Sequence, residues 1–401
     1  MTGSAPIRMG VLGLGRAFTL MVPTFAADAR VQLAAGHDPR AEAMVQLQRD
    51  FGAQPHDTPA SLCADPAVQW VYVASPHQCH AEHVLLAARH GKHVLLEKPM
   101  ALDLDQCQQM IDTCAAHGVA LVVGHSHSFD APVLAARRWI DSGALGQVRM
   151  VQAFNYTDFL YRPRRPEELD TPQGGGVVFS QAAHQVDVVR LLAGGRVRSV
   201  SAHTGAWDPA RPTEGAYSAL LSFEDGCFAS LSYNGYGHYD SDALMDHLSE
   251  LGQTKAAHAH AQTRQRWRDS DPAQEAERKA QRNYGSAQYV AQPAQAVQAH
   301  QHFGPVWVSG TRGDLRLMPW GLEVHDDEGV RQIRLPQPTV PRAEVIDELV
   351  QVGVHGRAPL HSGAWSRATL EVCLGILDAA RTHRTVSMHH QVAPDTGVLQ
   401  P

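Results

Sequence analysis

The sequence has few cysteines, no long apolar run and no excess of positive charge. Its six cysteines form neither a CxxC pair nor the dense, even set of a small secreted domain. Nothing approaches the roughly 20 consecutive apolar residues of a membrane span, and Arg16 and several glycines interrupt the one run that resembles a signal peptide. The formal charge of -7 offers no basic field to nucleic acid or to an anionic membrane. We therefore expect a cytoplasmic protein whose partners are small molecules.

The chain does have enough apolar residues for a large core. It has 401 residues, of which 44% are hydrophobic and 19% charged, a size that favours two domains. In the first part, short apolar runs at 7–12, 31–36, 70–74, 93–96 and 119–123 alternate with segments of helical spacing. Such alternation is typical of an α/β domain with a doubly wound parallel sheet. We predict an N-terminal Rossmann domain over residues 1–125.

The pattern changes after residue 125. Apolar alternation predicts strands at 148–156, 197–204, 217–223, 227–233 and 315–325, with helices near 178–192 and 364–382. Residues 126–401 are therefore expected to form an α+β domain with an open, largely antiparallel sheet. Residues 241–301 are rich in Gln, Ala, His and Arg and have weak apolar periodicity. We predict that they form a surface insertion, partly helical or mobile and less ordered than the sheet.

A glycine-rich turn follows the first predicted strand. Gly13 and Gly15 supply two glycines of the GxGxxG pattern, which directs backbone N–H groups and a helix N-terminus at a pyrophosphate. Phe18 replaces the third glycine and should widen the packing of the helix on the strand. Asp38 ends the second strand, where it can accept ribose hydroxyls or simply begin a turn. The pattern predicts NAD, with Arg40 leaving NADP open, bound by Gly13, Gly15, Arg16, Ala17, Phe18 and Asp38.

Several segments in order carry a family resemblance. They are GLGRAF, the strand end at Asp38, SPHQCHAEH at 75–83, GKHVLLEKP at 91–99, GGGVVFSQAAHQVD at 174–187, GTRGDLRL at 310–317 and AARTHRTV at 379–386. With these motifs the chain resembles the glucose-fructose oxidoreductase, inositol dehydrogenase and rhizopine catabolism (Gfo/Idh/MocA) family over nearly its whole length, apart from 241–301. The resemblance implies an NAD(P)-dependent oxidoreductase and a homo-oligomer.

The resemblance also implies roles for individual residues. Lys98 of the EKP motif and His184 on the helix after the triple glycine would transfer protons, work that suits a lysine of lowered pKa and a histidine. Ser180 departs from the family, which commonly has aspartate there, and this disfavours sugars and inositol as substrates. Asp187, one turn after His184, is either its charge partner or a residue behind the substrate. The implied cofactor contacts beyond the glycine turn are Ser75, Pro76, His77, His80, Glu97 and Lys98.

The abundance of histidine raises the question of a metal site. His77, His80 and His83 are spaced three apart, and His125 and His127 alternate on a predicted strand end. His77, His80 and His83 lie in the segment 75–83, which resembles a loop and helix of the family. His80 matches a family position that has a structural role on the cofactor side. We therefore predict no metal.

The segment 161–170, YRPRRPEELD, contains three arginines, at 162, 164 and 165. Guanidinium groups pair well with carboxylates, so the loop is either a trap for an anionic substrate or is balanced by Glu167, Glu168 and Asp170. With GHSHSFDAP and HFGPVWVS, the loop resembles the phthalate 4,5-cis-dihydrodiol dehydrogenase branch of the family, which forms 4,5-dihydroxyphthalate. The alternatives are a sugar or inositol dehydrogenase and a non-catalytic nucleotide-sensing regulator, the latter disfavoured by Lys98 and His184. The implied substrate contacts are Arg162, Arg164, Arg165, His127 and Asp187.

Overall fold

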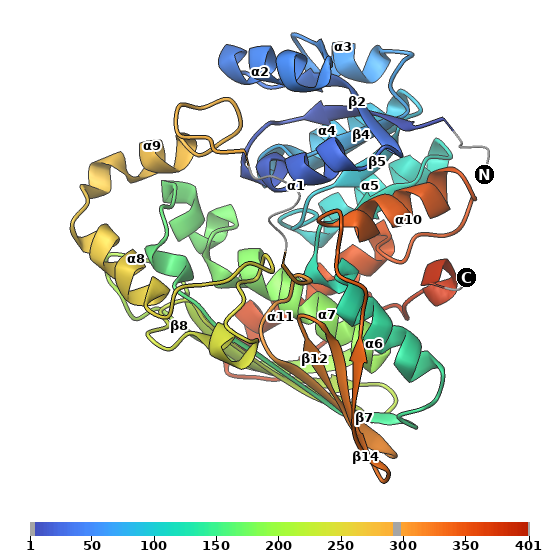
Figure 1. Cartoon of the computed structure of the whole chain (residues 1–401), viewed down its shortest axis with the longest axis vertical. Helices are drawn as coiled ribbons and strands as arrows, with labels where there is room; N and C mark the ends of the chain where they lie inside the picture. The colour runs from blue at the N-terminus through green and yellow to red at the C-terminus, as the bar shows by residue number, and fades with distance from the viewer. Residues whose placement is uncertain (1–4, 292–297, 400–401) are drawn as a thin grey trace.

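The computed structural model describes residues 5–291 and 298–399, and it contains two β-sheets, each covered by helices (Figure 1). The first sheet has the strand order β3-β2-β1-β4-β5-β6, and all of its pairs are parallel. This confirms the predicted doubly wound Rossmann sheet. Its strands are β1 Ile7–Leu12, β2 Val31–His37, β3 Gln54–Pro55, β4 Trp70–Val73, β5 His93–Leu96 and β6 Leu121–Val123. Its helices are α1 Arg16–Ala27, α2 Ala41–Phe51, α3 Pro59–Ala64, α4 His80–Arg89 and α5 Leu104–Ala116.

The second sheet has nine strands in the order β14-β13-β12-β11-β7-β10-β9-β8-β15. Only the pair of β7 and β10 is parallel, so the largely antiparallel prediction is confirmed. The helices α6 Ala131–Asp141, α7 Ala183–Ala193 and α11 Gly363–Thr382 pack on it. The strands are β7 Val148–Tyr156, β8 Val197–Gly205, β9 Ala216–Phe223, β10 Phe228–Asn234, β11 Val306–Gly310, β12 Gly313–Met318, β13 Gly321–Asp326, β14 Gly329–Arg334 and β15 Val386–Ser387.

One predicted strand was wrong in its extent. Residues 315–325 form two strands, because the register pairs Met318 with Gly321 and leaves Pro319 and Trp320 as a tight turn. Gly321 has a positive φ of 141°, a conformation that glycine adopts without steric cost. The apolar alternation continues through this turn, and for this reason the sequence reads as one strand.

The helix α10 Ala343–Gly353 belongs to the first sheet although it lies late in the chain. Val345, Ile346 and Leu349 are fully buried in the same core as Met9 and Tyr72. Nearby, the backbone N–H of Val123 in β6 donates to the carbonyl of His361 at 2.8 Å. Residue 125 therefore divides the chain between the two sheets, but the core of the first sheet also contains residues from much later in the chain.

The predicted insertion at 241–301 runs along one side of the molecule, from the second sheet up to the Rossmann domain (Figure 1). It contains the helices α8 Ala259–Arg268 and α9 Glu275–Ala280, in line with the expected partly helical character. The interpretation as a surface segment is wrong for Tyr284, which is fully buried because its ring packs edge-on against Phe18 at 5.1 Å. Part of the insertion, 292–297, lies outside the described residues.

No helix within 5–291 and 298–399 is both long and apolar enough to cross a membrane.

Candidate active site

The glycine turn forms a cradle at the carboxyl end of β1. Gly13 has a φ of +93°, and a Cβ there would lie 2.8 Å from backbone atoms of Ser75, so only glycine fits. A Cβ on Gly15 would meet nothing within 4 Å, which leaves open space beside the N-terminus of α1. The first turn of α1 has no acidic residue, so its N–H groups remain available to an anion. This cradle fits the pyrophosphate of the expected dinucleotide.

Asp38 lies beside the cradle and is held there by Arg40. Its Oδ2 accepts a hydrogen bond from the backbone N–H of Leu14 at 2.7 Å, and its Oδ1 accepts from Arg40 Nε at 2.9 Å. The two terminal nitrogens of Arg40 donate to the carbonyls of Tyr284 and Leu14, at 3.0 and 2.9 Å. All three guanidinium nitrogens of Arg40 thus have partners within the protein.

We expect NAD to be preferred over NADP. A 2′-phosphate would meet the carboxylate of Asp38, and Arg40 would have to give up its existing bonds to offer compensation. A preference of about 10-fold or more in kcat/KM corresponds to the ~1.4 kcal/mol of one such charged contact. Steady-state kinetics with both cofactors measures it, and a preference for NADP would show that Arg40 is released when the cofactor binds.

The loop after β4 approaches the cradle from the other side. The His80 ring is buried between the carbonyls of Pro99 and Ser75, at 3.0 and 3.1 Å, and burial lowers its pKa to about 4. His77 lies near the carbonyl of Gln173 at 3.2 Å, and His83 bonds the Ser75 hydroxyl. The three histidines therefore bond main-chain carbonyls and a hydroxyl, and the described part of the chain contains no group of three His, Cys, Asp or Glu residues placed to hold a metal ion.

Lys98 and Glu97 follow β5, and Lys98 lines a pocket together with Ala183 and Asp187 of α7, which we call the cleft. Lys98 Nζ donates to the carbonyl of Ser180 at 3.1 Å, and the Lys98–Pro99 peptide bond is cis. Burial lowers the pKa of Lys98, and the positive charge of Arg342 lowers it further, while Glu97 opposes both. Glu97 is itself buried, which raises its pKa, and it accepts a hydrogen bond from the Tyr72 hydroxyl at 2.5 Å. A lysine in this setting releases and accepts a proton more readily than a solvated lysine.

Ser180 contributes its main chain to Lys98 and directs its side chain elsewhere. It lies in a π-helical turn, Val178–Ala182, directly before α7, and its hydroxyl donates to the carbonyl of Gly176 at 2.5 Å. π-helical turns are frequent at functional sites because they shift the hydrogen-bonding pattern of a helix. At the position where the family commonly has a carboxylate, this chain therefore offers Lys98 a carbonyl oxygen.

His184 lies in the first turn of α7, and its ring approaches His127 at a centroid distance of 4.8 Å. Its Nδ1 is buried and has no hydrogen-bond partner among the described residues. Burial, with the charges of Lys98 and His127, holds the pKa of His184 well below the ordinary value, so the ring is neutral at neutral pH. His127 is in turn oriented by Asp130, whose Oδ2 lies 2.6 Å from His127 Nδ1.

The structure places Asp187 away from His184. Its Oδ2 accepts hydrogen bonds from the hydroxyls of Ser126, at 2.6 Å, and Ser128, and its Oδ1 accepts from Thr369 at 2.6 Å. The Asp187 carboxylate is buried, so a solvated role does not fit, and its described hydrogen bonds go to hydroxyl groups and not to His184. Asp187 holds α7 to the segment after β6 and to α11.

Each of the three arginines of 162–170 has an acidic neighbour. Arg162 Nε lies 2.7 Å from Asp158, and Arg165 Nε lies 3.1 Å from Glu167. Arg164 stacks over the Phe159 ring at 3.5 Å, and its nearest carboxylate, Glu168, is 3.7 Å away. Burial lowers the pKa of Arg164 to about 10, and its charge contributes to lowering the pKa of Lys98. The pairing of Arg164 and Arg165 with Glu167 and Glu168 fits the interpretation of a charge-balanced loop, and a role in binding an anionic substrate stays a prediction.

Three further charged residues lie near Lys98 or His127 and were missed by sequence reasoning. Asp130 could have been found from its place three residues after His127 in HSFD. Glu250 lies in the insertion, and its negative charge acts to raise the pKa values of Lys98 and Arg162. Arg342 is buried at the start of α10 and has a φ of +53°. Its positive charge lowers the pKa values of Lys98, His184 and Arg16. Neither of the last two lies in a motif, so only the fold brings them to the site.

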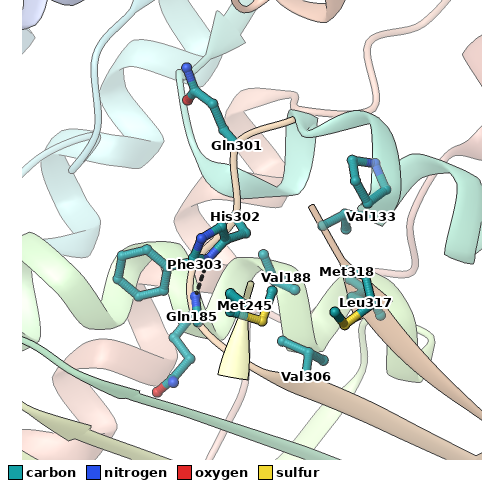
Figure 2. A pocket seen from close by; sticks show the side chains of 12 residues that line it. Val133, Gln185, Val188, Met245, Gln301, His302, Phe303, Val306, Leu317 and Met318 are labelled. Atoms are coloured by element: carbon teal, nitrogen blue, oxygen red, sulfur yellow. Dashed lines mark hydrogen bonds between the residues drawn. The ribbon is translucent and has the colours of Figure 1, made fainter. Parts of the chain in front are cut away.

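A largely apolar pocket lies next to His127 and His184, between α6, α7 and the strands β11 and β12. Figure 2 shows Val188, Met245 and Val306 facing this space. Phe303, which also lines it, contacts the rings of His127 and His184 at 5.0 Å. Among the described residues, no lysine, arginine or carboxylate lines the pocket.

Comparison with known proteins gives consistent matches. Residues 7–125 match the model of an oxidoreductase family with an NAD-binding Rossmann fold, and residues 133–246 match the GFO/IDH/MocA C-terminal domain. A 1-carboxy-3-chloro-3,4-dihydroxycyclohexa-1,5-diene dehydrogenase from Comamonas testosteroni is 45% identical over 94% of this chain and 95% of its own.

Solved structures agree with these matches. The crystal structure of a putative dehydrogenase from Bordetella bronchiseptica has a TM-score of 0.89 at 38% identity, covering 95% of this chain and 100% of that one. An oxidoreductase from Agrobacterium radiobacter in complex with NAD+ shares the fold, with a TM-score of 0.69 at 18% identity over 95% and 98% of the two chains. The chain therefore belongs to the Gfo/Idh/MocA family of NAD-dependent oxidoreductases.

Proposed function

We propose that this enzyme oxidises a carboxylated cyclohexadiene cis-diol, and that phthalate 4,5-cis-dihydrodiol is its substrate. The observation that carries the proposal is that Lys98 and His127 both lie near His184, and that Arg164 lies close enough to Lys98 for its charge to lower the pKa of Lys98. A diol substrate would place a hydroxyl beside the lysine and the two histidines. A carboxylate on the same substrate would pair with the arginine. The Comamonas relative supports this reading, because its name describes a cyclohexadiene ring with one carboxyl and two neighbouring hydroxyls.

Proton transfer in this cleft begins at Lys98. Its neutral amine takes the proton of the reacting hydroxyl, while the Ser180 carbonyl holds Nζ in place. The bound NAD supplies the acceptor for the hydride of the carbinol carbon. His184 is neutral, so it can hydrogen-bond the hydroxyl and share the proton with Lys98. The resulting hydroxyenone tautomerises: the neighbouring carbinol carbon gives up its proton and the ketone oxygen gains one, which forms the aromatic 4,5-dihydroxyphthalate and makes the reaction hard to reverse.

His127 is proposed to bind the second hydroxyl of the diol. Asp130 fixes its Nδ1, and no described residue bonds its Nε2, which leaves that atom for a ligand. The neighbouring His184 ring, 4.8 Å away, would then meet the first hydroxyl. Two imidazoles at this separation match two adjacent oxygen atoms better than they match a single alcohol.

The test is a substrate panel assayed by NADH absorbance. It compares phthalate 4,5-cis-dihydrodiol, a monocarboxylated cis-dihydrodiol, benzene cis-dihydrodiol and myo-inositol. We expect the two carboxylated diols to have the highest kcat/KM, with the dicarboxylate first. Preference for the monocarboxylate would retain the reaction class and reject phthalate, whereas preference for inositol, or no turnover of any diol, would reject the proposal.

A further inference from the structure

Residues 281–289, which we call the clasp, follow α9 and lie against the adenosine end of the expected cofactor site. Tyr284 anchors the clasp: its side chain is fully buried and its hydroxyl donates to Asp50 Oδ2 at 2.8 Å. Its ring packs edge-on against Phe18, the residue that replaces the third glycine of the fingerprint. The departure from GxGxxG therefore creates the surface on which a segment of the insertion docks.

Gly285 brings the clasp into backbone contact with α2. It has a φ of +79°, and a Cβ there would lie 2.5 Å from the Cα and 2.8 Å from the backbone N of Ala43. Such distances are too short for any side chain. Because Ala43 lies in the first turn of α2, directly after Asp38 and Arg40, the clasp contacts the Rossmann domain at its ribose-binding corner.

Two arginines connect the clasp to the cofactor site. Arg40 donates to the Tyr284 carbonyl at 3.0 Å and to the Ser286 hydroxyl at 3.2 Å while its Nε bonds Asp38. Arg282, exposed on the clasp, lies close enough to Arg16 at the start of α1 for its charge to lower the pKa of Arg16. The clasp thus adds a positive charge near the pyrophosphate cradle and keeps Arg40 on Asp38.

We propose that the clasp completes the NAD site, adding affinity for the dinucleotide and keeping Arg40 bound to Asp38 and therefore unavailable to a 2′-phosphate. Sequence distance hides this role, because the clasp lies in the insertion of the second domain and carries no nucleotide-binding motif. The clasp acts on the cofactor, whichever diol is oxidised.

Two matched glycine variants test the clasp. In Gly285→Ala the added methyl group must push the clasp away from Ala43. Gly226→Ala is the control, because Gly226 has a similar φ of +85°, lies in the turn between β9 and β10, and a Cβ there would meet nothing within 4 Å. We expect Gly285→Ala to raise the Kd of NADH, measured by fluorescence titration, about 10-fold, and to bring the Kd of NADPH closer to that of NADH. The control should leave both values near those of wild type.

Amide hydrogen exchange of the wild-type enzyme provides a second measurement that needs no variant. If the clasp contacts the cofactor, saturating NADH should slow exchange in 281–289 more than in the exposed helix α8. Equal NADH affinity in Gly285→Ala and wild type, or equal losses in both glycine variants, would overturn the proposal. If Gly285→Ala does not fold, the exchange experiment decides alone, and an unchanged clasp would reject the role.

Discussion

Replacing Lys98 with alanine is expected to lower kcat by about 100-fold or more, the scale of a positioned acid or base. In the proposed mechanism the amine accepts the hydroxyl proton, and the neighbouring Ser180 carbonyl cannot take its place. The Kd of NADH should change little, because the pyrophosphate cradle and Asp38 lie apart from the amine. Single-turnover kinetics and fluorescence titration measure the two quantities separately. Turnover near that of wild type would remove Lys98 from the mechanism.

The pH dependence of Lys98 gives an independent readout. Burial and Arg342 lower its pKa from the ordinary 10.5, so the neutral, proton-accepting form is populated at lower pH than in a solvated lysine. The kcat/KM of wild type should therefore rise with pH through a limb centred below 10.5. That limb should disappear in Lys98→Ala. A limb that persists unchanged in the variant belongs to another group.

At least one single alanine variant of Arg162, Arg164 and Arg165 should lower kcat/KM for the dicarboxylated diol by about 10- to 100-fold. A charge-assisted hydrogen bond contributes about 1.5–3 kcal/mol, and about 1.4 kcal/mol corresponds to one decade. Arg164 is the first candidate, because its charge reaches Lys98 and its nearest carboxylate is 3.7 Å away, beyond hydrogen-bonding distance. Its Nε and Nη2 donate to the Phe159 carbonyl at 3.2 and 2.8 Å, so Nη1 is the nitrogen we expect to bind a substrate carboxylate.

The arginine prediction has a substrate control and a variant control. Benzene cis-dihydrodiol lacks both carboxylates, so it should be a poor substrate whose kcat/KM barely responds to the critical replacement. Arg331→Ala, in the exposed β14 hairpin, removes the same charge far from the cleft and should behave as wild type. If all three loop variants process the dicarboxylate normally, phthalate is not the substrate and the family assignment alone remains.

The sequence predicts those parts of the fold and site that depend on local patterns. Strand periodicity located most strands. The EKP and triple-glycine motifs pointed to Lys98 and His184, because the first motif directly follows β5 and the second directly precedes the helical segment that contains His184. Asp187 shows the limit, since its spacing of one helical turn from His184 suggested a pair, whereas three hydroxyls from two other segments bind it. Arg342 shows the opposite failure, a residue that was not found. No local pattern marks it, because tertiary folding alone brings it near Lys98 and His184.

The late placement of α10 affects how the chain folds as it leaves the ribosome. The strands of the Rossmann sheet are synthesised first, but Val345, Ile346 and Leu349, which cover one of its faces, emerge only near the end of translation. Until then Met9 and Tyr72 lack part of their apolar cover. A nascent or truncated chain ending at residue 125 would expose this surface and be prone to aggregate. Expression of the cofactor-binding half alone therefore requires α10 to be supplied, either fused or in trans.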